Sequence, residues 1–383
     1  MSPRAYNGWI IGGLLLLLAP VLVLNLMLIA NDYRHDKNRL ASAWQQETGG
    51  VTYAPPISSN RLFKTLRLAD RLPQIDTVIF GSSTMLTLGA DLLPGHMRAY
   101  NFAQTGNPLL SVIGEARYLV NHEHQRVRRL IIPIDWAIGF VFDDGAAPEI
   151  DLSAARVPPP APPGPGARLR EALSLPRITV LGTVLRDIAQ AQDPRAMARR
   201  LFTEVVDEPY RCADGSLARD YDPVFRGKCV GFRADGTATF ADQKRVTEET
   251  APALLARAAS ASSQYAQSLD KTAGQPGAVL LGELSLLIRA ARERDIEVIL
   301  IMPPLLPQLD TRIAASLHSG AKLARTKSVL AAWARDQGLP IIDAGPSEQY
   351  GCTATEFIDG HHALPPCYRK IMTRLFAGRP ASP

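Results

Sequence analysis

Short apolar segments alternate with helical segments along most of this chain, and this alternation limits the folds that it can adopt. Five segments rich in β-branched and aliphatic residues are predicted to be strands: 77–80, 97–102, 130–134, 297–302 and 340–343. Apolar residues at helical spacing predict helices at 61–72, 110–121, 280–294 and 327–336. Strands that alternate with helices form parallel sheets covered on both faces. We therefore expect an α/β fold.

A long interruption separates the third predicted strand from the fourth. It includes a proline-rich run, 157–166, which can form neither a helix nor a central strand and is expected to be a stiff, exposed linker. Helices are expected after it, at about 168–175, 178–191 and 248–270. We interpret residues 151–275 as a helical insertion within one α/β domain that covers residues 73–383.

The N-terminal region contains an apolar run, residues 9–30, without a single charge. At about 1.5 Å per residue, this length crosses a hydrocarbon core of about 30 Å. A cleaved signal peptide would have a shorter apolar region and a small-residue cleavage site, and Leu28-Ile29-Ala30 is a poor site. We expect residues 1–30 to be a transmembrane anchor and residues 31–72 to be a polar juxtamembrane stalk that ends in a helix.

Charges near the apolar run bear on the side of the membrane that the domain occupies. Arg4 precedes the run, whereas Arg34, Lys37 and Arg39 follow it. Positive residues favour the cytoplasmic side, so this count alone would place the chain after the run in the cytoplasm. Over the whole chain the net charge of +5 is mild, and no block of Lys and Arg is dense enough to suggest nucleic-acid binding.

The cysteines instead favour a location of the domain outside the cytoplasm. Four cysteines form two local pairs, Cys212 with Cys229 and Cys352 with Cys367, and neither pair has Cys-x-x-Cys metal spacing. Two disulfides in an oxidising compartment explain these pairs better than zinc does, and four unrelated thiols are the alternative. We expect the domain to lie in the periplasm or outside the cell.

Polar residues follow three of the predicted strands. Ser82 and Ser83 come after the first strand, the loop 101–107 comes after the second, and Asp359 with His361 and His362 comes after the last. Ligands of an open parallel sheet bind beyond the carboxyl ends of its strands, so we expect these residues to lie together. A serine becomes a nucleophile when a histidine takes its proton and a carboxylate orients that histidine. This combination predicts a serine-nucleophile site.

Other chemistry at these residues is less consistent with the sequence. The chain has no Walker lysine and no G-x-G-x-x-G motif, so nucleotide binding is not expected, and neither is any other cofactor. Asp359 and the two histidines could instead bind a metal ion, and a metal-dependent hydrolase remains an alternative to our prediction of no metal.

The segment Phe80-Gly81-Ser82-Ser83 resembles the Gly-Asp-Ser block of the SGNH/GDSL hydrolase family, with Ser82 in place of the aspartate. The resemblance covers about 76–136 and 297–376. It implies a flavodoxin-like, three-layer fold with five parallel strands, and it makes 73–383 an SGNH-like domain. It also implies that Ser83 is the nucleophile and that Gly106 contributes to the oxyanion hole with the N–H of Ser83. The family's late Asp-x-x-His block matches Asp359 and His362.

The resemblance breaks at the end of the third strand. The family normally has an asparagine there that donates to the oxyanion, and this chain has Asp135. An ionised carboxylate accepts hydrogen bonds and would repel an oxyanion unless it is protonated or turned away. The N–H groups of Ser83 and Gly106 would remain as donors, and Asn107 is a candidate substitute. Ser82, Asp135 and His361 are expected near the site.

The chain also resembles a membrane-anchored subgroup, which includes the teichoic-acid D-alanylation protein DltD and the alginate acetylation proteins. These work beside membrane-bound O-acyltransferases, which implies such a partner and a polysaccharide substrate. We expect an O-acyltransferase or acyl-esterase that acts through a serine acyl-enzyme. The alternative is a non-catalytic anchor or assembly subunit of a polysaccharide modification or export complex. A disulfide between Cys352 and Cys367 would hold the loop of Asp359 and His362.

Overall fold

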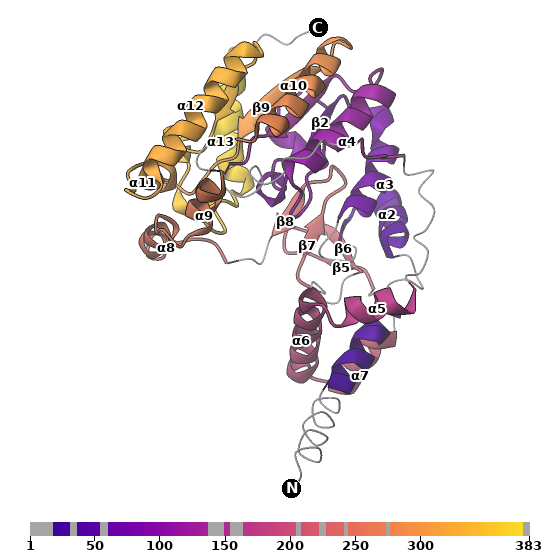
Figure 1. Ribbon diagram of the computed structural model, residues 1–383. Helices are drawn as coiled ribbons and strands as arrows, with labels where there is room; N and C mark the ends of the chain where they lie inside the picture. Colours follow the sequence, from indigo (N-terminus) through magenta and orange to yellow (C-terminus); the bar gives the residue numbers. More distant parts are fainter. Residues whose placement is uncertain are drawn as a thin grey trace. The chain divides into compact units, whose positions relative to one another are not determined.

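The computed structural model describes residues 18–30, 37–53, 60–136, 149–153, 164–203, 208–221, 227–240, 244–272 and 276–377. The chain divides into two compact units, 1–63 with 155–231 and 64–154 with 232–383 (Figure 1). The expected insertion, 151–275, is therefore divided between them, because residues 232–275 belong to the larger unit.

The larger unit contains a sheet of five parallel strands in the order β10-β9-β4-β2-β3. The strands are β2 (Thr77–Ile79), β3 (Ala99–Asn101), β4 (Arg129–Pro133), β9 (Glu297–Met302) and β10 (Ile341–Asp343). This is the flavodoxin-like order, in which the chain reverses its direction of winding between β2 and β4. All five strands lie where the sequence predicted them, which confirms the α/β class and the parallel sheet.

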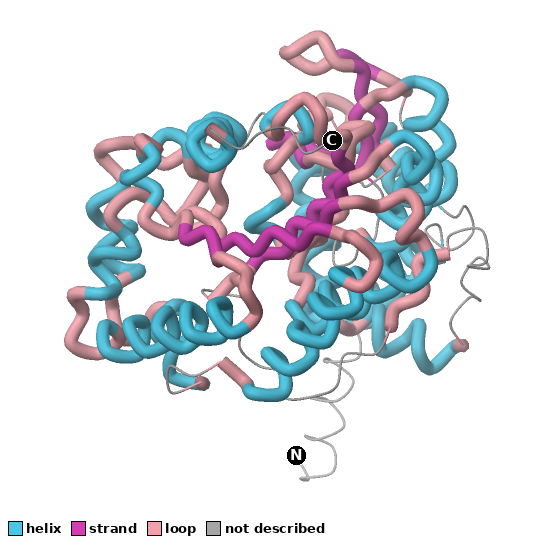
Figure 2. Tube along the Cα trace, turned by 90° about the horizontal axis from the view of Figure 1, so that it is seen from above, coloured by secondary structure: helices cyan, strands magenta, loops and turns pink. Residues whose placement is uncertain are grey.

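Helices lie on both sides of this sheet (Figure 2). The α-helices are α3 (Arg61–Arg71), α4 (Leu109–His122), α8 (Ala251–Ala258), α9 (Gln264–Lys271), α10 (Ala278–Arg292), α11 (Leu309–Ala314), α12 (Gly320–Asp336) and α13 (Pro365–Phe376). Short 3-10 helices are η1 (Leu72–Gln74), η2 (Ser83–Met85), η3 (Ala90–Leu92), η4 (Ser347–Tyr350) and η5 (Ala354–Glu356). In α10 the buried residues Leu280, Leu284, Leu287 and Ala291 recur at helical spacing and form one apolar face.

One predicted helix, 248–270, is in fact two. Helix α8 ends at Ala258 and α9 begins at Gln264. Serine hydroxyls bind the backbone of the intervening turn: Ser260 Oγ donates to the carbonyl of Arg257, and Ser263 Oγ accepts from the N–H of Ala266. Such local bonds compete with a continuous helix, so the serine-rich segment interrupts it.

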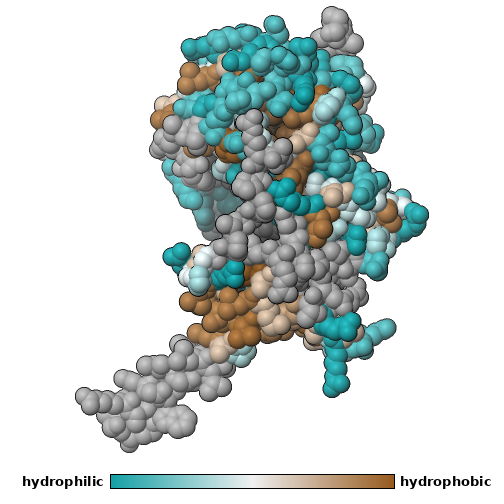
Figure 3. Space-filling view, turned by 90° about the vertical axis from the view of Figure 1, so that its right-hand side faces the viewer, coloured by the Kyte–Doolittle hydropathy of each residue, from teal (hydrophilic) through white to brown (hydrophobic). Residues whose placement is uncertain are grey.

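The smaller unit combines helices with short strands. Its helices are 18–30, α2 (Lys37–Thr48), α5 (Pro165–Ala172), α6 (Leu175–Gln190) and α7 (Pro194–Thr203), and its strands include β1 (Val51–Tyr53), β5 (Tyr210–Arg211), β6 (Leu217–Asp220) and β7 (Val230–Phe232). Strand β6 pairs in parallel with β1 and antiparallel with β5, a sheet that was not predicted. A further short strand, β8 (Ala238–Phe240), belongs to the larger unit. Figure 3 shows apolar residues gathered on the surface at the level of α5 to α7.

The predicted anchor and stalk are described only in part. Residues 1–17, 31–36 and 54–59 lie outside the described residues. Residues 37–53 form α2 and β1, with Trp44 and Val51 buried. Among the described residues, no helix combines the length and the apolar character that crossing a membrane requires.

Both predicted disulfides are present. Cys212 is bonded to Cys229 with a Cα–Cα distance of 5.7 Å, and Cys352 to Cys367 with one of 5.0 Å. The first contributes to a small core with Val51 and Ala218 in the smaller unit. The second lies in the larger unit, where Cys352 precedes α13 and Cys367 lies in its first turn.

Candidate active site

Ser83, His362 and Asp359 form one chain of hydrogen bonds. Nε2 of His362 lies 2.8 Å from Oγ of Ser83, and Nδ1 of His362 lies 2.7 Å from Oδ2 of Asp359. Both distances are within the reach of proton transfer. With Nδ1 donating to the carboxylate, Nε2 is the acceptor for the serine proton. The structure brings together the three residues proposed as catalytic.

The turn after β2 explains how Ser83 is presented. Gly81 has a φ of 144°, a conformation that side chains rarely adopt. A Cβ at this position would lie 2.6 Å from Cγ of Met85 and 3.0 Å from Cγ of Pro133. Glycine is therefore required at 81, and the sharp turn that it permits starts η2 at Ser83, beyond the end of the strand.

Asp359 and His362 lie in a tight loop before α13. Phe357 and Ala363 form an antiparallel bridge across it, and the N–H of Ile358 donates to the carbonyl of His362 at 3.0 Å. Oδ1 of Asp359 accepts from the backbone N–H groups of His361 and His362, both at 2.9 Å. The carboxylate thus orients the backbone and the imidazole of its own loop.

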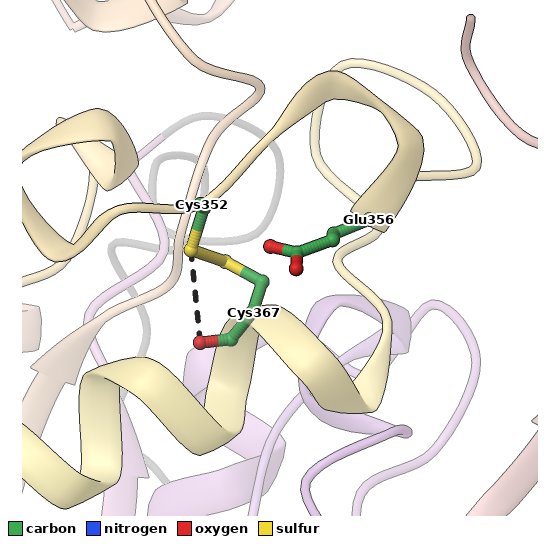
Figure 4. A group of neighbouring side chains, drawn as sticks. All are labelled: Cys352, Glu356 and Cys367. Carbon is green, nitrogen blue, oxygen red and sulfur yellow. Dashed lines mark hydrogen bonds between the residues drawn. A yellow bond between two sulfur atoms is a disulfide. The ribbon is translucent and has the colours of Figure 1, made fainter.

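The disulfide closes the base of this loop (Figure 4). Sγ of Cys352 lies 3.6 Å from the carbonyl oxygen of Cys367, and the Glu356 carboxylate is beside the pair. Because both sulfurs are joined to each other, this group offers no thiolate to a metal ion. Glu356 instead accepts from Nζ of Lys370 at 2.7 Å and from the N–H of Thr353 at 3.1 Å.

Two buried hydrogen bonds join the loop of the base to the segment of the nucleophile. The hydroxyl of Tyr368, on α13, donates to the carbonyl of Thr84 at 2.6 Å. The hydroxyl of Thr87 donates to the carbonyl of Ala363 at 2.5 Å. Ser83 and His362 are 279 residues apart in the sequence, so these contacts fix the distance between them.

Asp135, at the end of β4, is bound by the neighbours of the nucleophile. Its side chain is buried, and its Oδ2 accepts from Oγ1 of Thr84 at 2.9 Å and from Oγ of Ser82 at 3.3 Å. The carboxylate is therefore directed to the hydroxyls on either side of Ser83. These contacts indicate that Asp135 holds the turn of η2. Thr84 is a site residue that was not predicted.

The N–H groups of Ser83 and Gly106 are the expected oxyanion donors, and the loop of Gly106 contacts the turn before Ser83, where the N–H of Gln104 donates to the carbonyl of Gly81 at 2.9 Å. Within the described residues, neither the N–H of Ser83 nor that of Gly106 donates a hydrogen bond to the chain. Gly106 has a φ of 66°, in the left-handed region that favours glycine. The side chain of Asn107 donates to Oε2 of Glu115 at 3.0 Å, which uses one of its two amide hydrogens.

Glu115 is a second unpredicted site residue. It is fully buried on α4 and also accepts from the amide of Gln104 at 2.8 Å. It thereby orders the loop of Gly106 from two points. A single carboxylate on an otherwise apolar face of α4 is the sequence signal that could have identified it.

The two histidines have different electrostatic environments. Burial, together with the neighbouring His362, lowers the pKa of His361 to about 4, so His361 is neutral at pH 7. Its Nδ1 lies 2.9 Å from the hydroxyl of Tyr265 and 3.2 Å from Nε2 of Gln264. Burial alone would raise the pKa of Asp359, but the hydrogen bonds that its carboxylate accepts from the ring of His362 and the backbone N–H of His361 outweigh burial and lower that pKa. Asp359 is therefore ionised and suited to stabilise a charged His362.

A metal ion fits these residues less well than proton transfer does. The ligand atoms of Asp359, His361 and His362 lie within 4.8 Å of one another, which is close enough for a shared ion. However, the two ring nitrogens of His362 are already bonded to Asp359 and Ser83. An imidazole held between a carboxylate and a hydroxyl is arranged to move a proton.

A cavity of about 460 Å³ lies beside Asp359, Gly360 and His361. Helices α8 and α9 and the turn between them form its other wall, with Arg257, Ser260, Ser262, Gln264 and Tyr265 among the lining residues. A wall rich in hydroxyl and amide groups suits a ligand that itself has many hydroxyls.

The chemistry of the site rests on its geometry. The nucleophile, base and carboxylate are contiguous, two backbone donors are unoccupied among the described residues, and a cavity adjoins Asp359. Comparison of the chain with protein-family models, with curated proteins and with solved structures gives no match.

Proposed function

We propose that this protein is an exported, membrane-anchored O-acyltransferase or acyl-esterase of SGNH type that acts on a cell-surface or exported polysaccharide. The observation that carries the proposal is the continuous path from Asp359 through His362 to Ser83, with steps of 2.7 and 2.8 Å. This path is the arrangement that activates a serine for attack on an acyl group.

The first half-reaction forms an acyl-enzyme. Oγ of Ser83 attacks the carbonyl carbon of the acyl donor while Nε2 of His362 takes its proton. The resulting oxyanion is bound by the N–H groups of Ser83 and Gly106, and Asp359 stabilises the imidazolium. Collapse of the intermediate breaks the bond to the leaving group, which receives the proton from His362.

The second half-reaction releases the acyl group. An acceptor hydroxyl gives its proton to His362 and attacks the acyl carbon, and Ser83 is restored when it takes that proton back. A sugar hydroxyl as acceptor gives an acyltransferase, and water gives an esterase. The hydroxyl-rich cavity beside Asp359 and His361 supports a polysaccharide acceptor. A membrane-bound O-acyltransferase is the proposed source of the acyl group.

The proposed location follows from the apolar run 9–30 and the disulfides. The run has the length of a single transmembrane helix, and two disulfides are expected in proteins of oxidising compartments. The domain would then face the periplasm or the cell exterior, where polysaccharide is modified.

The test of the proposed function is the reactivity of Ser83. The purified protein should be labelled by a serine-directed fluorophosphonate and should hydrolyse p-nitrophenyl acetate. Ser83→Ala should abolish labelling and lower hydrolysis by about 10⁴-fold or more. Ser316→Ala, outside the site, is the matched control and should behave as the parent. Labelling that survives in Ser83→Ala would exclude Ser83, and activity lost with a chelator would favour a metal site.

A second candidate function is a non-catalytic anchor or assembly subunit. It is favoured by one observation, Asp135 at the position where an oxyanion donor is expected in the SGNH family. The two candidates differ in a deletion strain, where a catalytic protein requires Ser83. Restoration of polymer acylation by Ser83→Ala would support the scaffold function.

A further inference from the structure

Helix α6 has an exposed apolar face. Leu175, Ile178, Gly182 and Leu185 are spaced three or four residues apart and are all exposed, with Leu175 at 76%. The opposite face is buried through Leu181 and Val184. A surface helix normally places charged residues opposite its core face, but α6 has no charge from Ile178 to Leu185.

The same surface continues onto neighbouring helices of the smaller unit. Leu169 and Leu173 are exposed at 45% and 42%, within and directly after α5. Nδ2 of Asn25 donates to the carbonyl of Ala172 at 2.8 Å, which joins the helix 18–30 to the end of α5. That helix exposes Val23 at 55%. We call Leu169, Leu173, Leu175, Ile178 and Leu185 the apolar face.

Basic residues border the apolar face. Arg170 and Arg186 are exposed beside Leu169 and Leu185. Two acidic residues adjoin these arginines in the sequence: Glu171, which is paired with Arg177 at 2.8 Å, and Asp187. Leucines and isoleucine next to arginines, on helices too short or too polar to cross a bilayer, are the pattern of helices that lie in a membrane interface. Isolated exposed leucines would need no such explanation, but a contiguous apolar surface does.

We propose that α5 and α6 lie in the interfacial layer of the membrane, with the apolar face among the upper acyl chains and Arg170 and Arg186 at the lipid phosphates. The helix 18–30 is bonded to α5 and continues the uncharged run that starts at residue 9, which places the apolar face at the membrane end of this unit. The proposal rests on the membrane attachment proposed above. It adds that the smaller unit lies on the bilayer and is not merely tethered to it.

The experiment measures membrane depth with introduced tryptophans. The full chain is reconstituted into vesicles of phosphatidylcholine and phosphatidylglycerol, as the parent and as Leu175→Trp, Leu185→Trp and Leu317→Trp. Leu317, in the larger unit, is fully exposed and is the matched control. Because an interfacial helix inserts about 5–10 Å, lipids brominated near the top of the acyl chain should quench the added emission of the first two variants about twofold. The emission added by Leu317→Trp should be unaffected by brominated lipid and quenched by aqueous iodide.

The outcomes separate this proposal from the attachment on which it rests. If the parent does not float with vesicles, the membrane attachment fails, and this proposal fails with it. If it floats but iodide quenches Leu175→Trp and Leu185→Trp as strongly as Leu317→Trp, the attachment stands and the interfacial proposal is overturned. That result would leave the apolar face for a protein partner. Hydrolysis of p-nitrophenyl acetate reports separately on the active site.

Discussion

The two disulfide loops of this protein are similar in length and differ in what they hold. Cys212 and Cys229 are 17 residues apart, and Cys352 and Cys367 are 15 apart. The first loop contains β6 and packs around a small core in the smaller unit. The second contains Asp359 and His362. The same covalent restraint therefore supports stability in one loop and catalytic geometry in the other.

Their non-covalent contacts show the same difference. In the first loop β6 pairs with β1, and the side chain of Asp220 accepts from the hydroxyl of Tyr210 at 2.7 Å and from the N–H of Gly227, so these contacts stay within the smaller unit. In the second, Ala363 accepts from Thr87, on the segment that carries the nucleophile. Changes in the second loop should thus reach Ser83, and changes in the first should not.

The largest expected difference between the loops concerns one carboxylate in each. Asp359→Asn should lower kcat/KM for p-nitrophenyl acetate by about 10⁴-fold, because an amide no longer stabilises the charged His362 or fixes its tautomer. Asp214→Asn, in the first loop, is the matched control and should retain the parent rate. A loss below about tenfold for Asp359→Asn would contradict the proposed role of Asp359.

Removal of the second disulfide should affect both stability and activity. In the loop-entropy treatment, a bridge that closes about 15 residues contributes about 3 kcal/mol to the free energy of unfolding. Cys352→Ser with Cys367→Ser should lose about this amount in urea denaturation. It should also lower the rate of fluorophosphonate labelling of the folded protein, because the loop of His362 is no longer closed. An unchanged labelling rate would show that non-covalent contacts suffice.

Removal of the first disulfide should affect stability alone. Cys212→Ser with Cys229→Ser should also lower the free energy of unfolding by about 3 kcal/mol, because its loop is of similar length. The labelling rate per folded molecule should equal that of the parent. A reduced labelling rate would show that the first disulfide also affects the geometry of the site.

The pH dependence of stability should report on His361. Its pKa is about 4 in the folded protein and about 6.5 in the unfolded chain, so the unfolded chain binds more protons between these values. The free energy of unfolding should therefore fall as the pH decreases from 6.5 to 4. The free energy of unfolding should fall by about 2 kcal/mol. This is somewhat less than the pKa shift of His361 alone implies, because its side chain is partly exposed.

The variant His361→Asn isolates this contribution. Asn keeps an acceptor for the hydroxyl of Tyr265 and cannot take up a proton, so its denaturation midpoint in urea should change less over the same pH range. Equal pH dependence in parent and variant would exclude His361 as the source.

The smallest expected effect concerns the contact between α13 and the nucleophile segment. Tyr368→Phe leaves the buried carbonyl of Thr84 without its donor, at a cost of about 1 kcal/mol in the free energy of unfolding. Tyr350→Phe, whose hydroxyl donates to the carbonyl of Asp343 at 3.0 Å, is the control outside both loops. A labelling rate that falls in Tyr368→Phe but not in Tyr350→Phe would show that Tyr368 also positions the site.

The parallel sheet was predictable because its strands are apolar and separated by amphipathic helices. The segment Glu297–Met302 was predicted at its observed bounds. The small sheet was not predictable, since β5 has two residues and β6 reads Leu-Ala-Arg-Asp without alternation of apolar and polar side chains. Strands this short are defined by their partners.

Some residues of the candidate site were predictable because their residue type and their order along the chain are enough to identify them. Ser83, Asp359 and His362 are of this kind. Thr84, which binds Asp135, and Glu115, which binds Asn107, were not predictable. They act through buried contacts that depend on the folded backbone. Sequence indicates which residues can react, and packing determines which residues hold them.

The separation of 279 residues between Ser83 and His362 also has a consequence for synthesis of the protein. A chain is made from its N-terminus, so Ser83 leaves the ribosome long before its base exists. The nascent chain carries an ordinary, unreactive serine throughout most of its translation. The hydrogen bond between Ser83 and His362 forms only when the last part of the larger unit has been made and the loop of His362 has closed against the segment of Ser83.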